Sequence, residues 1–429
     1  MTGVRNAGTG SHGGKQHVVV IGAGLVGVAC ALWLQRAGMG VTLVDRAEPG
    51  SGASFGNAGT FATYASAPVG TPKVIRGLPG MLFDPAGPLS IRWRYLPKLA
   101  GWLARFARHS TRAEVERISR ALHLLLDRAH EGYAPLLRDI DSASLVRSKG
   151  CLYLFGTDAE FDAAAADLAL KARRGVAVEV LGRDAVRQME PAIAPVYAKA
   201  VYFPDATHTI DPGALTLDLA DLFRRQGGRI LCDSVERIEV VDGRATGAVT
   251  AGGDIRGDQF VLAAGAWSKT LAATLGDRVP LDTERGYHVM IPRRDVVARP
   301  VAWSRGGFYL TPMVEGLRVA GTVELAGLKR PPDPRRLRRL VAGARHLVPD
   351  LPEPVSEWMG FRPSMPDSLP VVGRSPTVAN AIHAFGHGHL GLTLAGITGR
   401  IVADLAAGRA ADPDIGAFAP DRFRRFRLG

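Results

Sequence analysis

Cysteine is scarce in this chain, and long apolar runs are missing. Three cysteines, Cys30, Cys151 and Cys232, occur in 429 residues, and their spacing fits neither a metal site nor a redox motif. Because their neighbours are apolar, we expect buried inert thiols, a reducing compartment and no bound metal. No apolar run reaches the roughly 20 residues that cross a bilayer. No hydrophobic segment follows the N-terminus either, so we expect a cytoplasmic protein.

Acidic residues are outnumbered by basic ones. The chain has 53 Lys and Arg against 41 Asp and Glu, a formal net charge of +12. These basic residues are spread out without a recognition motif, so nucleic acid is not expected as a partner. Residues 73–108 differ, because seven basic residues and one acid are interleaved with Trp, Phe and Leu. Two interpretations are open for this segment: peripheral contact with the inner face of an anionic cytoplasmic membrane, or an amphipathic cover for the core.

The most informative pattern that is present occupies residues 17–45. An apolar strand leads into a glycine turn, a helix follows, and a second strand ends at Asp45. This βαβ order, with an acid at its tip, is typical of a site for an adenine dinucleotide. The glycines permit the turn, the approach of a pyrophosphate and close packing of the helix. The carboxylate favours a ribose with a free 2′-hydroxyl. The expected contacts are Gly22, Ala23, Gly24, Leu25, Val26, Gly27, Asp45 and Arg46.

Elements of the nucleotide-binding type recur along the chain, at 17–60, 212–267 and 370–408. The pattern predicts a discontinuous nucleotide domain made of residues 17–70, 200–275 and 355–415. A second domain, with a strand meander, is predicted at 71–199 and 276–354, and residues 1–16 are expected to be a disordered tail. Helices are expected at 112–130, 158–174, 212–227, 333–347 and 393–407.

Four further motifs follow the βαβ unit in order, at residues 51–59, 263–268, 360–364 and 386–391. With that unit they resemble the FAD-dependent D-amino acid oxidase/dehydrogenase superfamily, and residues 54–59 are most similar to its bacterial D-amino acid dehydrogenase branch. The resemblance implies FAD as cofactor. It also implies an α/β fold: a glutathione-reductase-like FAD-binding Rossmann domain with an inserted mixed-sheet α+β substrate domain.

The resemblance also implies which residues approach the flavin. Small residues after the second strand would allow its close approach, and a helix beginning near Thr393 would direct its positive end toward the flavin pyrimidine. The implied contacts near the flavin are Ser54, Asn57, Ala58, Gly59, Gly388, His389, Leu390, Gly391, Leu392 and Thr393. Ala264 and Gly265 would pass the pyrophosphate, and Val235 would meet the adenine through its backbone.

Arg362 is the residue most favoured for the substrate. In the relatives, the arginine of the corresponding motif pairs with the substrate carboxylate, a geometry that suits its planar fork. Tyr309 is expected to close over that carboxylate, and Tyr287 and His288 are expected to line the pocket. The alternative for Arg362 is a surface or packing role.

The implied reaction is oxidation of a D-amino acid, with D-proline or 4-hydroxy-D-proline as candidate substrates. A hydride would pass from Cα to flavin N5, and the electrons would then pass to a quinone or another acceptor. An oxygen-using amine oxidase similar to glycine or sarcosine oxidase is an alternative, as is a flavin-binding subunit without independent activity. A dehydrogenase that uses nicotinamide alone is disfavoured, because no second dinucleotide domain is present.

Overall fold

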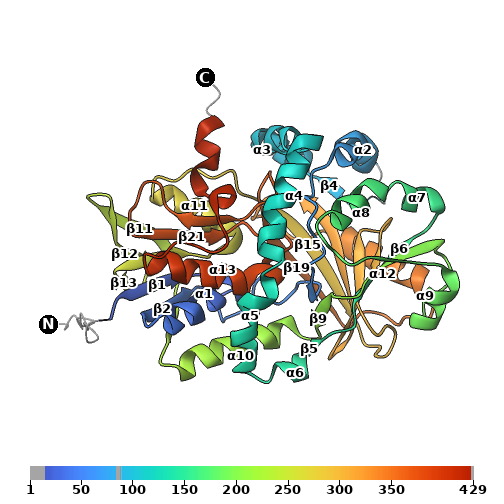
Figure 1. The fold of residues 1–429 in the computed structure, drawn as a ribbon, viewed down its shortest axis with the longest axis horizontal. Coiled ribbons are helices and arrows are strands. Elements are labelled where there is room, and N and C mark those ends of the chain that lie inside the picture. Colours follow the sequence, from blue (N-terminus) through green and yellow to red (C-terminus); the bar gives the residue numbers. More distant parts are fainter. Residues whose placement is uncertain (1–14, 84–86, 88, 427–429) are drawn as a thin grey trace.

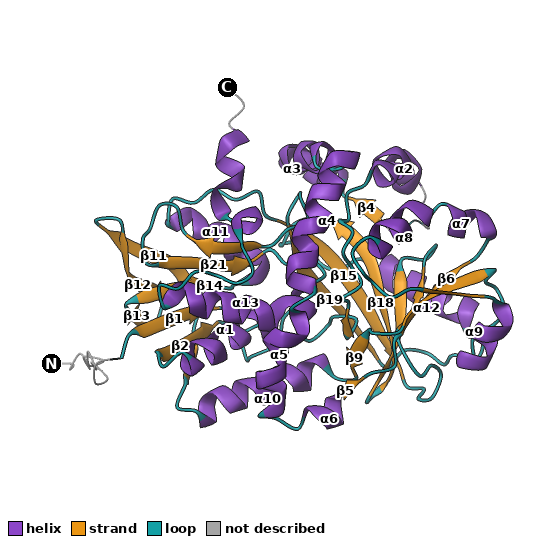
Figure 2. Ribbon diagram, viewed as in Figure 1, coloured by secondary structure: helices purple, strands orange, loops and turns teal. Residues whose placement is uncertain are grey.

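A computed structural model describes residues 15–83, 87 and 89–426 of the chain, so most of the predicted 1–16 tail lies outside the described residues. Figure 1 shows two lobes, each built on its own large sheet, with helix α4 (Arg112–Leu126) crossing in front of their junction. Figure 2 shows helices covering both lobes.

The first lobe contains a six-stranded sheet. Its order is β10-β2-β1-β14-β21-β20, and all neighbours are parallel except β20 and β21. The strands are almost wholly apolar, as expected for a parallel sheet that is covered on both faces. Helices α1 (Leu25–Arg36), α10 (Pro212–Arg225) and α13 (Gly391–Ala406) bury one face. Strands β11 (Val235–Val241) and β12 (Arg244–Thr250) and helix α11 (Ser268–Thr274) bury the other. The strands are β1 (His17–Ile21), β2 (Gly40–Asp45), β10 (Arg229–Cys232), β14 (Gln259–Leu262), β20 (Val371–Arg374) and β21 (Ala381–Phe385).

The second lobe contains a nine-stranded mixed sheet. Its order is β19-β15-β18-β17-β16-β6-β8-β7, and β4 pairs with β18. Helix α12 (Pro334–Leu347) packs apolar side chains against one face. The strands are β4 (Leu89–Ile91), β6 (Cys151–Phe155), β7 (Glu179–Leu181), β8 (Lys199–Phe203), β15 (Asp282–Ile291), β16 (Val301–Trp303), β17 (Phe308–Met313), β18 (Gly316–Leu325) and β19 (Ser356–Ser364).

Two small sheets and several helices complete the described chain. The sheets are β11 (Val235–Val241), β12 (Arg244–Thr250) and β13 (Gly253–Arg256), and β3 (Thr60–Phe61), β9 (Thr207–Thr209) and β5 (Val146–Arg147). The remaining helices are α1 (Leu25–Arg36), α2 (Pro72–Phe83), α3 (Leu96–Arg108), α5 (Ala129–Arg138), α6 (Ser142–Leu145), α7 (Asp158–Asp162), α8 (Ala165–Ala172), α9 (Arg183–Met189), α10 (Pro212–Arg225), α11 (Ser268–Thr274) and α13 (Gly391–Ala406), with short 3₁₀ turns at Trp93–Tyr95, Gly265–Trp267, Gly416–Phe418 and Pro420–Phe426.

The sheets divide the chain somewhat differently from the predicted pieces. Strand β19 lies inside the piece predicted as 355–415, and β8 lies at the start of the 200–275 piece, yet both pair within the nine-stranded sheet. The sequence could not reveal this, because the partners of both strands are distant segments. Strand β19 therefore carries Arg362 on the sheet of the second lobe.

Two predicted helices are broken in the structure. The stripe at 112–130 is divided between α4, which Thr111 caps by accepting from the Glu114 N–H, and α5. Helix α5 then continues beyond the predicted end and packs Gly132 against the backbone of Gly396 in α13. The stretch at 158–174 is likewise two helices, α7 and α8.

The cysteines form no disulfide, and their environments differ. Cys30 and Cys151 are buried, and desolvation raises the pKa of the Cys151 thiol to about 12. Cys232 is exposed at the edge strand β10, which corrects the expectation of three buried thiols. Across the described ranges, we find no helix with both the length and the apolar character needed to cross a membrane.

Candidate cofactor and substrate site

A cavity of about 790 Å³ extends from the carboxyl ends of β1, β2 and β14 to strands β15, β17, β18 and β19. Its volume is in the range of roughly 300–1,000 Å³ that is usual for cofactor and ligand sites. Carboxyl ends of parallel strands are also where ligands bind in sheets of this kind. The cavity is therefore the candidate site for a dinucleotide and a substrate together.

The glycine turn forms one end of the cavity. Gly22 has φ of +112°, and a Cβ there would lie 2.4 Å from the Ala263 carbonyl oxygen. A Cβ on Gly27 would lie 1.8 Å from the Gly22 oxygen, so only glycine permits this packing of α1. Helix α1 begins without a side-chain cap, and its Leu25 N–H donates to the Ser54 hydroxyl at 2.9 Å. The other N–H groups of its first turn suit a pyrophosphate.

Two charged residues lie where β2 ends. The Asp45 carboxylate accepts from the Ala23 N–H at 2.7 Å and from the Ala47 N–H at 3.1 Å, which fixes it beside the turn. The Arg46 guanidinium lies over the Trp267 ring, with Cζ 3.7 Å from the ring centre. These three side chains line the cavity, as Val235 does. The Asp45 carboxylate suits the hydroxyl groups of a ribose, and the planar stack of Arg46 and Trp267 suits an adenine ring.

A second helix, α13, begins at the same cavity. Its N-cap residue Leu390 makes no side-chain capping bond, and Gly391 and Leu392 line the cavity. Gly265 and Gly388 have φ of +54° and +56°, and nothing lies within 4 Å of the Cβ position of either. The open space at the two glycines and the helix N-terminus suit the close approach of a flat ring that carries carbonyl groups.

Most of the predicted cofactor residues share this lining. They are Gly22, Ala23, Gly24, Leu25, Val26, Asp45, Arg46, Ser54, Asn57, Ala58, Val235, Ala264, Gly265, Gly388, His389, Gly391 and Leu392. Outside the lining are Gly27, Gly59, Leu390 and Thr393. Each of these four supports the wall: for example, the Thr393 hydroxyl accepts from the Ala62 N–H at 2.9 Å.

Arg362 lines the opposite part of the cavity, on β19. Its Nη1 donates to the Thr322 carbonyl at 3.0 Å, and the guanidinium leans over Gly286, where a Cβ would lie 2.4 Å from Cζ. Thr322 has φ of +57°, a costly conformation for a β-branched residue that is found mainly at functional sites. Desolvation lowers the pKa of Arg362 and the charge of Glu284 opposes that shift, so the guanidinium stays charged.

Tyr309 also lines the cavity, from strand β17. Its hydroxyl bonds to that of Tyr153, whose ring it meets edge-on. Desolvation raises the pKa of Tyr309 to about 12, so the phenol stays protonated and remains a hydrogen-bond donor at neutral pH.

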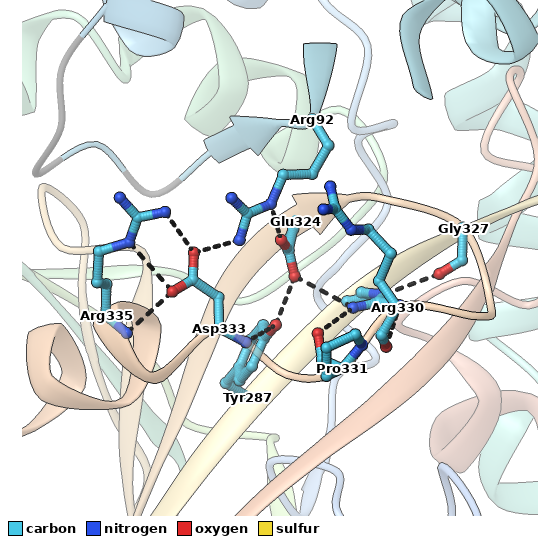
Figure 3. A network of polar contacts seen from close by, with 9 residues as sticks. Arg92, Tyr287, Glu324, Gly327, Arg330, Pro331, Asp333 and Arg335 are labelled. Atoms are coloured by element: carbon cyan, nitrogen blue, oxygen red, sulfur yellow. Dashed lines mark hydrogen bonds and ion pairs between the residues drawn. The ribbon is translucent and has the colours of Figure 1, made fainter. Parts of the chain in front are cut away.

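Tyr287 and His288 do not line the cavity, contrary to the expectation from sequence. Figure 3 shows Tyr287 in a polar network with Glu324 and Asp333, where its hydroxyl bonds to Glu324 at 2.5 Å and accepts from the Asp333 N–H. His288 stacks on Trp358 and bonds to the Gly56 carbonyl at 3.1 Å. Successive side chains of β15 point to opposite faces, so Tyr287 points away from the face that carries Glu284 and Gly286. His288 shares that face, but it contacts Trp358 and Gly56, which line the cavity in its place.

Four histidines, among them the predicted site residues His288 and His389, are held neutral. Desolvation lowers the pKa of His288 to about 3 and those of His208 and His387 to about 4. His389, which is exposed to the cavity, has its pKa lowered to about 4 by desolvation from the surrounding walls and by the charge of Arg362. None of the four therefore contributes a positive charge at neutral pH.

Glu284 and Thr322 are cavity residues that the sequence interpretation did not select. Alternation along the strand places Glu284 on the same face as Gly286, but nothing in the sequence shows that this face holds the cavity. Nothing in the sequence marks Thr322, whose backbone conformation becomes visible only in the fold.

The fold and this cavity define a flavin-dependent oxidoreductase of the two-lobed kind. Residues 17–405 match the family model described as FAD dependent oxidoreductase. The chain belongs to that family, and its cofactor is FAD.

Curated relatives match over nearly the whole chain. A D-amino-acid oxidase of Bradyrhizobium diazoefficiens is 38% identical, over 95% of this chain and 99% of its own length. A D-amino acid dehydrogenase of Paramagnetospirillum magneticum is 34% identical over the same shares. Among solved structures, a glycine oxidase from Geobacillus kaustophilus shares the fold with a TM-score of 0.71 at 24% identity, covering 97% of this chain and 100% of that one.

Proposed function

We propose that the chain oxidises D-amino acids, and that cyclic imino acids such as D-proline and 4-hydroxy-D-proline are within its range. The observation that carries the proposal is the charged Arg362 guanidinium in the wall of the cavity that the FAD-binding turn enters. FAD, when bound, accepts the hydride that leaves Cα. The curated relatives at 33–38% identity, named as D-amino acid oxidase or dehydrogenase, support the substrate class.

The surroundings of Arg362 support a compact substrate. Strand β18 lines the cavity with Ala320, Gly321 and Val323 beside Thr322, so part of the wall that β17 and β18 form is apolar. Arg362 would hold the substrate carboxylate with its planar fork, and Tyr309, a protonated donor, would close over it. A small aliphatic chain or a five-membered ring suits the remaining apolar wall. Orientation by these contacts is the main contribution of the chain to the rate.

The test is turnover of purified protein on D- and L-amino acids with a dye as electron acceptor. We expect reduction of the dye with D-enantiomers, D-proline among them. Arg362→Ala should lower kcat/KM at least about 10³-fold, because a charge-assisted bidentate contact and the orientation that it gives are both lost. Arg362→Ala should keep its FAD, since the glycine turn is untouched. Turnover by that variant at the wild-type rate would remove the assignment.

The electron acceptor is a separate part of the proposal. We propose a membrane quinone, reached by docking of the segment around α3. Trp93 is 63% exposed there, and Arg94, Lys98 and Arg108 are exposed beside it. Most other aromatics of the segment turn inward: Trp102 and Phe106 stack in a buried cluster. The side chains of residues 81–83 lie outside the described part.

Flotation with anionic phosphatidylglycerol vesicles tests this docking, with phosphatidylcholine vesicles as control. Binding to the anionic vesicles alone, released by salt and weakened by Trp93→Ala, is the expected result. Oxygen is the second candidate acceptor, favoured by the relative named as an oxidase. Stoichiometric peroxide during turnover, with no vesicle binding, would select oxygen.

A further inference from the structure

A carboxylate lies beside Arg362 in the wall of the cavity. Strands β15 and β19 are antiparallel, and their register places Glu284 directly opposite Arg362. Residues opposite one another in such a pair have Cβ atoms about 4.5–5.5 Å apart and project from the same face. Both side chains line the cavity, so one wall presents a negative and a positive group side by side.

The two groups do not neutralise each other. Among the described residues no ion pair joins Glu284 to Arg362, because the guanidinium leans over Gly286 and donates to the Thr322 carbonyl. Gly286 permits this arrangement, since a Cβ there would collide with the guanidinium at 2.4 Å. The neighbouring carboxylate of Asp282 accepts from the Tyr95 hydroxyl at 2.9 Å and does not line the cavity, whereas Glu284 does.

We infer that Glu284 receives the amino group of the substrate while Arg362 holds its carboxylate. An α-amino acid carries its two opposite charges on groups bonded to the same carbon, Cα, and this cross-strand pair presents the complementary charges from one rigid sheet. The inference rests on the proposed function, because it takes an amino acid as the ligand. It adds a specificity: ligands that keep the carboxylate but lack the amine lose the contact with Glu284.

The electrostatics of Glu284 agree with this role. Desolvation raises the pKa of its carboxyl, while the charge of Arg362 and a hydrogen bond with Ser364 lower it. A carboxylate that is partly desolvated gains most from a cationic partner, so the arrival of an ammonium group is favourable there.

The experiment compares binding of two matched ligand pairs to the holoenzyme by anaerobic stopped flow. The shift of the flavin absorbance band that precedes any bleaching measures the binding of each ligand. One pair is D-proline and (R)-tetrahydro-2-furoate, in which an ether oxygen replaces the amine. The other is D-alanine and D-lactate. Glu284→Gln should weaken binding of the amino acids about 10- to 100-fold, the usual size of a hydrogen bond to a charged group. Both carboxylates without an amine should bind within twofold of wild type, or more tightly.

The control is Glu357→Gln, which removes the same charge from an exposed position on β19 outside the cavity lining. This variant should bind all four ligands as the wild type does. A Glu284→Gln protein with full FAD content that binds both members of a pair as tightly as the wild type does, or loses affinity for both members by the same factor, overturns the inference. Failure of the proposed function has another signature: the wild type reduces no dye with D-amino acids. The titrations need no turnover, so they still decide the role of Glu284. A wild type that binds none of the four ligands overturns both proposals.

Discussion

The position of the Arg362 guanidinium depends on the absence of a side chain at residue 286. In Gly286→Ala the new Cβ would lie 2.4 Å from Cζ, whereas ordinary contact begins at 3.4 Å, so the guanidinium must retreat by about 1 Å. The backbone of Gly286 does not have positive φ, so alanine adds no backbone strain there. A displacement of about 1 Å of a positioning group can cost on the order of 100-fold in rate. We therefore expect kcat/KM to fall about 100-fold while the flavin content stays normal.

Steady-state dye reduction measures this loss, and Gly182→Ala is the matched control. Gly182 has open space at its Cβ position and lies before α9, away from the cavity, so its variant should retain full activity. A double-mutant cycle with Arg362→Ala shows whether the alanine acts through Arg362, because coupled substitutions are not additive. Wild-type kcat/KM in Gly286→Ala, or a further 100-fold loss in the double variant, would refute the reasoning.

Two other predictions concern stability. Tyr287→Phe should lower the free energy of unfolding by about 1–3 kcal/mol in urea titrations, because buried Glu324 and the Asp333 N–H each lose a hydrogen-bond partner. Its kcat/KM should stay within about twofold of wild type, and a large loss of activity would place Tyr287 in the site after all. Stability should also fall as the pH drops from about 6.5 to about 4. In this range only the unfolded chain protonates His208 and His387, so each of them lowers the free energy of unfolding by up to ~1.4 kcal/mol per pH unit. Thermal melts across this range should show a shallower decline for His208→Gln, and an unchanged decline would contradict the assignment.

The local features of the fold were readable from sequence, and the pairing of distant segments was not. The glycine turn, helix α1 and Asp45 belong to one continuous stretch whose chemistry fixes its geometry. Arg362 was identified by its motif, but its cross-strand partner Glu284 depends on the register between β15 and β19. Tyr287 was misplaced for a related reason: alternation along β15 shows that it and Gly286 face opposite sides, but not which side holds the cavity.

The central claim is that a bound flavin and Arg362 act together on D-amino acids. Anaerobic mixing of the purified protein with D-proline tests it most directly, because the flavin absorbance reports binding of the cofactor and reduction in one measurement. The account predicts a yellow protein that D-proline or another D-amino acid bleaches, that L-enantiomers do not bleach, and that stays yellow in Arg362→Ala. Protein that takes up no FAD, or whose flavin is reduced equally well after that substitution, would contradict it.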